Sequence, residues 1–225
     1  MISLFFLPKN ATILTQYYLT AARQTSMNKT SLNNNALKAG LVCSMLISAI
    51  FITGCQENSK WNHQDPGLPA SFYQTQQQLL DTAQAKLKQN PQDFTSQFEV
   101  AFRYQNLGNL RAAVAEYQKV LAIPGNEKDF ATLNNLAASY KNAEDYANAA
   151  KYVKMLYETN PDNDRVIGTT VEILLLNNEP DAANAALTNF TKVLKEKKTG
   201  TDSDQAIISQ LYQSIVDYKT KHGIK

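Results

Sequence analysis

The sequence predicts an all-α protein built around an α-solenoid of about three helix pairs, with one further helix on each side. The main observation is a pattern of small and apolar residues that returns about every 35 residues, the length of a helix-pair repeat. Two of its positions keep step with each other, Tyr104, Tyr140 and Leu174 at the first and Ala113, Ala149 and Ala183 at the second. A unit of this length cannot bury its own apolar face, so neighbouring units must stack into one continuous core.

Composition and charge are those of a globular protein that does not bind nucleic acid. The chain has 225 residues, of which 44% are hydrophobic and 19% charged, as in ordinary globular proteins. The formal charge of +2 is misleading, because four basic residues precede Cys55 and all 20 acidic residues follow it. From Cys55 onward the balance is weakly acidic, which disfavours a phosphate backbone as partner.

The part of the chain before Cys55 indicates an export signal behind an over-extended start. Residues 1–26 hold a short apolar run without clear periodicity, and we interpret them as an over-extended start of the chain. Residues 27–54 contain two lysines, then 14 uncharged residues from 39 to 52, then Thr53 and Gly54. This is the three-part organisation of a signal peptide. The apolar run is shorter than the ~20 residues that a membrane-spanning helix needs.

The end of this segment, Ile52-Thr53-Gly54-Cys55, resembles the lipobox of bacterial lipoproteins. The resemblance implies that the Cys55 thiol receives diacylglycerol, that the leader is cut before it, and that Cys55 begins the mature chain. Acyl chains contribute about 0.8 kcal/mol per buried CH₂, so two or three hold a protein at a membrane. Gln56 in place of Asp implies the outer membrane of the cell envelope, where the cell has one. The alternative is a buried cysteine in an uncleaved anchor.

Residues 55–70 have few apolar side chains and two prolines, so we interpret them as a flexible tether that reaches ~20 Å. Trp61, the sole tryptophan, is expected either at the membrane interface or as a cap on the first helix. Residues 71–93 follow as an N-terminal packing helix. Ser71 is its expected N-cap, and Asn90-Pro91 ends it.

Residues 94–193 hold the repeats, as units 94–127, 130–163 and 164–193. Their signature positions are Gln97, Val100, Ala101, Tyr104, Ala113, Tyr117, Val120 and Pro124 in the first, Leu133, Leu136, Ala137, Tyr140, Ala149, Val153, Leu156 and Pro161 in the second, and Ile167, Thr170, Val171, Leu174, Ala183, Leu187 and Phe190 in the third. The pattern resembles that of tetratricopeptide repeats (TPRs). The resemblance implies a right-handed solenoid in which these residues form the core.

Small residues in this pattern are expected where two helices of one unit cross. Ala101 with Ala113, and Ala137 with Ala149, let antiparallel helices approach closely. Gly108 supplies the turn inside the first unit.

The C-terminal part predicts a last helix over residues 202–222 that caps the solenoid, with Asp202 or Ser203 as its N-cap. An alternative is that its apolar face docks a partner helix. Four lysines between residues 192 and 198 fit either an anionic-lipid patch or a solvated helix C-terminus, which favours cations.

Catalytic and metal-binding patterns are missing from the repeat region, so we expect a non-catalytic protein without cofactor or metal. The histidines, His63 and His222, lie outside the repeats, and no cysteine follows Cys55. Ser-His-Asp, Cys-His and zinc arrangements therefore lack a member. The glycines are scattered singly, so there is no phosphate cradle. Asp162-Asn163-Asp164 is interpreted as the turn between units, since it lacks the glycine and glutamate of a calcium loop.

The TPR resemblance also implies a concave groove that holds a protein or peptide partner. Carried over one by one, its positions are Phe98, Glu99, Phe102 and Asn106 in the first unit, Asn134, Asn135, Ala138 and Lys141 in the second, and Arg165, Thr169 and Glu172 in the third. Repeats that grip a terminal carboxylate have lysine and asparagine where this chain has two phenylalanines. Phe98 and Phe102 therefore either form an apolar anchor pocket, with Asn135 and Lys141 holding the partner's backbone or an acidic group, or pack under the preceding helix.

Two functions follow from these expectations. The first is a lipid-anchored interaction scaffold in the bacterial cell envelope, attached to the membrane through Cys55 and serving the assembly of envelope complexes. The second is a lipoprotein enzyme that acts on the cell wall through groove carboxylates, which would need an acid–base pair such as Glu144 and Asp145.

Overall fold

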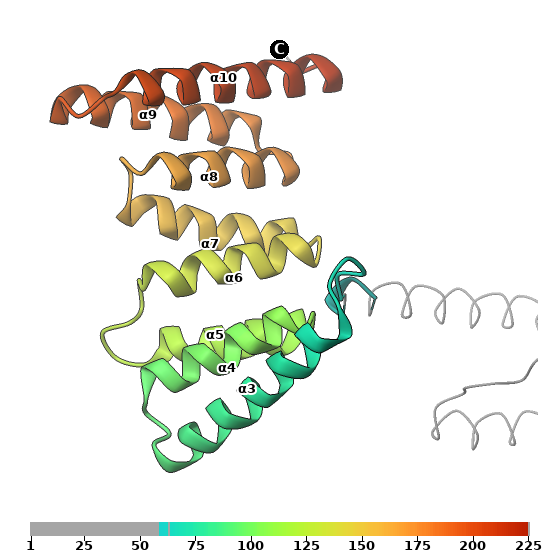
Figure 1. The fold of residues 1–225 in the computed structure, drawn as a ribbon. Coiled ribbons are helices and arrows are strands. Elements are labelled where there is room, and N and C mark those ends of the chain that lie inside the picture. The colour runs from blue at the N-terminus through green and yellow to red at the C-terminus, as the bar shows by residue number, and fades with distance from the viewer. Residues whose placement is uncertain (1–58, 63, 225) are drawn as a thin grey trace, which may run out of the picture. The chain divides into compact units, whose positions relative to one another are not determined.

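The computed structural model describes residues 59–62 and 64–224, which contain eight α-helices and no β-strand. The helices stack in chain order (Figure 1). Their bounds are α3 Ala70–Gln89, α4 Phe94–Asn106, α5 Leu110–Ala122, α6 Phe130–Asn142, α7 Tyr146–Thr159, α8 Asp164–Leu176, α9 Pro180–Lys197 and α10 Asp202–His222. The predicted export signal and Cys55 lie outside the described residues. Among the described helices, none is long and apolar enough to cross a membrane.

The helix starts follow the same period as the core. Side chains of Asp93, Asp129 and Asn163 accept backbone N–H groups at the starts of α4, α6 and α8. Asn109 and Asp145 do the same for α5 and α7. Such caps satisfy amide groups that have no partner inside a helix. The sequence analysis missed the caps, although they recur at the same spacing as the core positions.

The turn inside each unit also repeats. Gly108, Glu144 and Asn178 occupy one position of the repeat, and all three have positive φ, at 76°, 58° and 60°. This left-handed conformation costs nothing for glycine, whereas an L side chain is strained there. The turn then sends the second helix of each unit back along the first.

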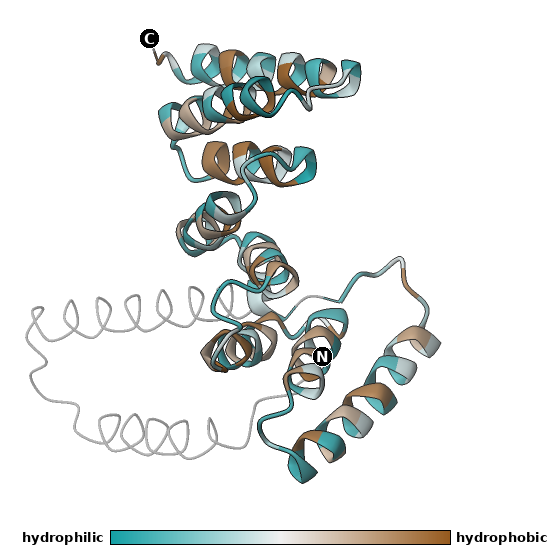
Figure 2. Ribbon diagram, turned by 90° about the vertical axis from the view of Figure 1, so that its left-hand side faces the viewer, coloured by the Kyte–Doolittle hydropathy of each residue, from teal (hydrophilic) through white to brown (hydrophobic). Residues whose placement is uncertain are grey.

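Three antiparallel pairs result, α4 with α5, α6 with α7 and α8 with α9, which confirms the predicted all-α solenoid with the TPR fold. Ala101, Ala113, Ala137, Ala149 and Ala183 are fully buried, as expected for residues at close helix crossings. Larger side chains fill the space between the pairs, and one apolar core runs from Ala101 to Ile215. Figure 2 shows the hydrophobic residues turned toward the neighbouring helices.

The two flanking helices pack on the ends of this core. α3 lies against α4, where Leu80, Ala83 and Val100 form a separate small cluster. α10 lies against both α8 and α9. Their caps differ from the expected ones. α3 begins after Pro69 without a side-chain cap, and α10 begins at a capping box formed by Thr201 and Asp204.

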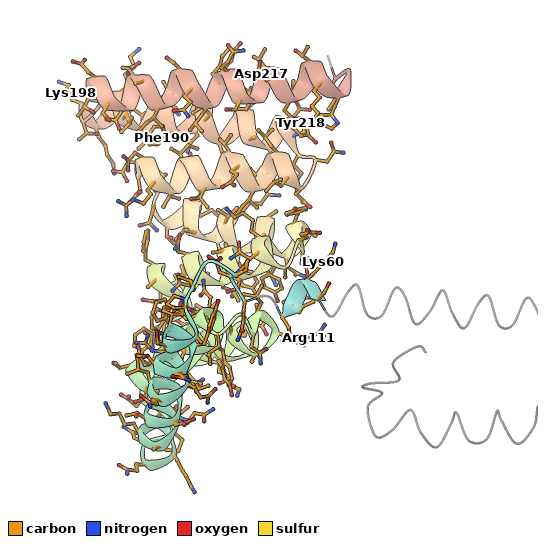
Figure 3. The ribbon with its side chains drawn as sticks, turned by 45° about the vertical axis from the view of Figure 1, so that its right-hand side comes forward. Lys60, Arg111, Phe190, Lys198, Asp217 and Tyr218 are labelled. Carbon is orange, nitrogen blue, oxygen red and sulfur yellow. The ribbon has the colours of Figure 1, made fainter. Side chains whose placement is uncertain are left out.

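The flexible tether expected over residues 55–70 is wrong for its described part. Trp61 packs edge-to-face on Tyr140 of α6 with ring centroids 5.8 Å apart, and the Arg111 guanidinium lies 5.2 Å from its ring centroid. Lys60 pairs with Glu144, and Asn62 forms an isolated antiparallel bridge with Asn109. Figure 3 shows Lys60 and Arg111 beside this segment.

Trp61 therefore lies neither at a helix end of α3 nor free for a membrane interface. It buries its ring against two units of the solenoid, which offsets the entropy of ordering the segment. We call residues 59–62 the tryptophan clip.

Candidate partner-binding groove

The predicted groove residues lie on the first helices of the three units and leave the packed face. The fully buried positions of α6 are those of the signature, whereas Asn134, Asn135, Ala138 and Lys141 are partly exposed. Arg165 and Glu172 of α8 are exposed, and Thr169 is half-buried. This pattern agrees with a surface made by the first helices. Whether a partner binds there stays a prediction.

The aromatic residues of the first unit form a closed row. Phe98 packs edge-to-face on Tyr117 of α5 at 5.6 Å between ring centroids, and it stacks on Phe94 and Phe102 at 6.3 Å each. The Arg103 guanidinium lies 5.2 Å from the Phe102 ring centroid. Phe98 thus packs on the second helix of its own unit, and neither phenylalanine lines any of the cavities described below.

Glu99 and Asn106 are engaged by α3 and its neighbours. The Gln76 side-chain oxygen on α3 accepts hydrogen bonds from Arg103 Nη1 at 2.8 Å and from Asn106 Nδ2 at 3.1 Å. Arg103 Nε donates to Glu99 at 2.8 Å. Gln76 is buried, so these polar groups satisfy one another inside the α3–α4 contact. The carry-over from the TPR pattern did not anticipate a helix packed so closely before the first unit.

Asn135 has a structural partner as well. The Tyr117 hydroxyl donates to Gln105 Oε1 at 2.8 Å. Burial raises the pKa of Tyr117 well above its usual value, and a hydrogen bond with Asn135 partly offsets this rise. Tyr117 therefore stays neutral, and Asn135 holds part of the α4–α6 contact.

The second and third units are joined across the groove face by one ion pair. Lys141 Nζ on α6 lies 3.1 Å from both carboxylate oxygens of Glu172 on α8. Both side chains are substantially exposed, so the pair contributes only about 0–1 kcal/mol to stability. A partner group could therefore displace either side chain at little cost.

Two cavities flank this ion pair. One, of about 360 Å³, lies between the starts of α6 and α8 and is lined by Phe130, Asn134, Asn163, Asp164, Arg165 and Val166. It brings together two predicted groove residues, Asn134 and Arg165. Phe130 is 43% exposed at its edge, although it begins a helix and has the largest apolar surface nearby.

The second cavity, which we call the α8–α10 pocket, has a volume of about 530 Å³. Its apolar lining is Val171, Leu175, Leu176 and Leu211, and its polar lining includes Glu172, Tyr218, Lys221 and His222. Leu176 is 43% exposed. Tyr218 extends from α10 toward the helices below it (Figure 3), where its hydroxyl donates to Asn178 at 2.9 Å. The sequence analysis missed this pocket, because it forms only when α10 lies beside α8.

Carboxylates of the described residues are held in ion pairs and caps. Glu144 pairs with Lys60, Asp145 caps α7, and Glu179 accepts a hydrogen bond from Lys154 at 2.5 Å. Wherever a described carboxyl pKa is clearly displaced, it is lowered. The hydrogen bond from Lys154 lowers that of Glu179, and the bond from Lys197 lowers that of Asp162. A general acid needs the opposite shift. Nor do the described residues contain a metal-type cluster of His, Cys, Asp or Glu.

Comparisons with known proteins concern the fold. No family model matches the chain, and no curated protein matches it. Residues 41 to the end of MamA from Desulfovibrio magneticus RS-1 superpose at a TM-score of 0.47 and 12% identity, covering 65% of this chain and 86% of that one. A TPR protein from Parabacteroides merdae ATCC 43184 gives 0.47 and 16% over 64% and 59%. A thermophilic TPR protein from Thermus thermophilus gives 0.42 and 19% over 63% and 78%.

Proposed function

We propose that this protein is a lipid-anchored scaffold of the bacterial cell envelope that binds a protein or peptide between α6, α8 and α10. The observation that carries the proposal is the α8–α10 pocket, an apolar cavity whose rim is charged. Apolar side chains that enter such pockets supply most of the energy of protein recognition, and the charged rim selects and orients the partner.

The C-terminal half of the groove suits this role better than the N-terminal half. In the first unit, the phenylalanine row packs on itself and on Tyr117, and α3 engages Glu99 and Asn106. Around α8, by contrast, two cavities and the exposed side chains of Phe130 and Leu176 remain open. A partner that bridges both cavities would cross the Lys141–Glu172 ion pair. No observation on the described residues favours the alternative, an enzyme that uses groove carboxylates.

The binding site can be tested with a photoreactive amino acid at Leu176, which lines the pocket, and at Asn184, an exposed position on α9. After illumination of intact cells, we expect one product at position 176 and none at position 184. Leu211→Glu, placed in the same pocket, should remove that product while the melting temperature stays close to the parent value. Equal products at both positions, or a product that survives Leu211→Glu, would contradict the site.

The anchor is tested separately, because it depends only on Ile52-Thr53-Gly54-Cys55. Intact-mass analysis of protein extracted from membranes should show a chain that begins at Cys55 and carries the mass of two or three acyl chains. Cys55→Ser should leave the leader uncut and remove the acyl mass. A mature chain that still carries residues before Cys55 would refute the lipoprotein assignment.

A further inference from the structure

The last helix has the register of the first helix of a repeat unit. Seven, eight and eleven residues after the cap Asp129, α6 carries Leu136, Ala137 and Tyr140, which meet α7 and the neighbouring pair. The same steps from the cap Thr201 reach Ile208, Ser209 and Tyr212 on α10. Tyr140 and Leu174 at the last of these positions are 7% and 1% exposed, whereas Tyr212 is 57% exposed. α10 thus presents the face on which a second helix packs in the complete units.

The first described helix has the opposite register. Asn90-Pro91-Gln92-Asp93 follows α3 as Asn160-Pro161-Asp162-Asn163 follows α7, so α3 corresponds to the second helix of a unit. Aligning these two turns places Leu79 at the position of Ala149, which is also the position of Ala113 in the first unit. Ala149 is fully buried under the first helix of its unit, whereas Leu79 is 38% exposed. α3 thus presents the face on which a first helix packs.

A seat for such a first helix is visible beside Leu79. A cavity of about 180 Å³ is lined by Leu79, Thr82 and Lys86 of α3 together with Thr95 and Glu99 of α4. A first helix in this fold contacts its own second helix and also the first helix of the next unit, as α4 contacts α6. The cavity therefore combines the two helices that the missing element would touch.

We propose that these two faces join two copies of this chain, so that α10 of one copy packs against α3 and α4 of the next and completes a repeat unit. The lengths agree, because α10 has 21 residues and α3 has 20, whereas the helices of the complete first and second units have 13 or 14. α3 and α10 lie at the two ends of the described stack (Figure 1). Such a head-to-tail contact joins different faces, so it propagates into an open chain of copies.

The charges of the two helices select the antiparallel orientation found inside each unit. Asp202 and Asp204 lie in the first turn of α10, and Lys86 and Lys88 lie in the last turn of α3. When the helices are antiparallel and centred on each other, Tyr212 lies opposite Leu79, and the two acids meet the two lysines. The centre of the contact is then apolar and its end is charged, which is the usual anatomy of a protein interface.

Cysteine cross-linking on the full chain tests this arrangement. The native cysteines are Cys43 and Cys55, so the parent chain gives the background. In membranes or extracts oxidised with copper–phenanthroline, the double variant Leu79→Cys with Tyr212→Cys should form a ladder of dimers, trimers and larger species. The double variant Thr75→Cys with Val216→Cys, exposed positions that the antiparallel contact places opposite each other, should do the same. A control that pairs Leu79→Cys with Asn184→Cys should give only the background.

Single variants decide between modes of association. Leu79→Cys alone and Tyr212→Cys alone should not cross-link to themselves, but a mixture of the two should give a dimer. Self-cross-linking of either single variant would indicate a symmetric dimer and overturn the proposal. So would background levels in both double variants, a ladder of equal yield in the control, or products that contain another protein in place of a second copy. Melting curves of each variant check that the fold is retained.

Discussion

Replacing Ala149 with leucine tests the packing of the solenoid most directly. Ala149 is fully buried where α7 crosses α6, opposite the equally buried Ala137. A leucine adds three heavy atoms at a crossing that has no room for them. Overpacking of this kind typically costs about 1–3 kcal/mol, because the helices must move apart or side chains must leave their preferred rotamers.

The chain itself contains a comparison for this substitution. α3 has a leucine, Leu79, at the same position of the repeat, and there the side chain is 38% exposed. A large residue is thus accepted at this position where no described first helix crosses it. Ala149→Leu places the same residue type where α6 does cross, so its cost reports on the crossing rather than on the residue.

The assay is thermal unfolding followed by circular dichroism, with Ala147→Leu as the matched control. Ala147 lies two residues earlier on α7 and is exposed, so the same chemical change there should alter stability by less than about 0.5 kcal/mol. For a chain of this size, 1 kcal/mol corresponds to roughly 2–4 °C in Tm. We therefore expect Ala149→Leu to lower Tm by about 2–12 °C. An unchanged melt, or an equal shift in the control, would refute the repeat register.

Three further predictions concern the turns, the tryptophan clip and one ion pair. Gly108→Ala should destabilise by about 1–2 kcal/mol because of its positive φ, whereas Gly168→Ala, inside α8 with open space at its Cβ, should stabilise by about 0.5–1 kcal/mol in urea titrations; equal signs would contradict the turn. Iodide should quench Trp61 fluorescence much less in the folded chain than in urea, unless the clip is unpacked. Because Lys154 lowers the pKa of Glu179, the stability that Lys154→Met removes should be present at neutral pH and shrink below about pH 4.3; a pH-independent difference would contradict this linkage.

The core of the fold could be predicted because it depends on residues that recur at a fixed spacing. Ala101, Ala137 and Tyr140 face the same neighbours in every unit, so the repeat alone indicates which side chains are buried. The caps and the left-handed turns obey the same period, and they could have been found by extending the comparison from Gly108 to Glu144 and Asn178.

The candidate site was harder to predict, because it depends on elements that do not repeat. The α8–α10 pocket needs the placement of α10, and the loss of Glu99 and Asn106 from the groove needs that of α3. Trp61 also escaped prediction, since a segment rich in polar residues with two prolines has the composition of a tether. One aromatic ring with Tyr140 and Arg111 as neighbours is enough to change that outcome.

The tryptophan clip has a consequence for how the protein would stand on a membrane. Three residues, 56–58, separate Cys55 from the clip, and a fully extended chain over that interval spans at most about 14 Å. With Cys55 lipidated as proposed, the edge of the solenoid that carries Asn109 and Glu144 would be kept within that distance of the headgroups. The body could then neither rise far from the bilayer nor turn freely about its anchor. The lipid would set which edge of the protein faces the membrane, and with it the side from which a partner can approach.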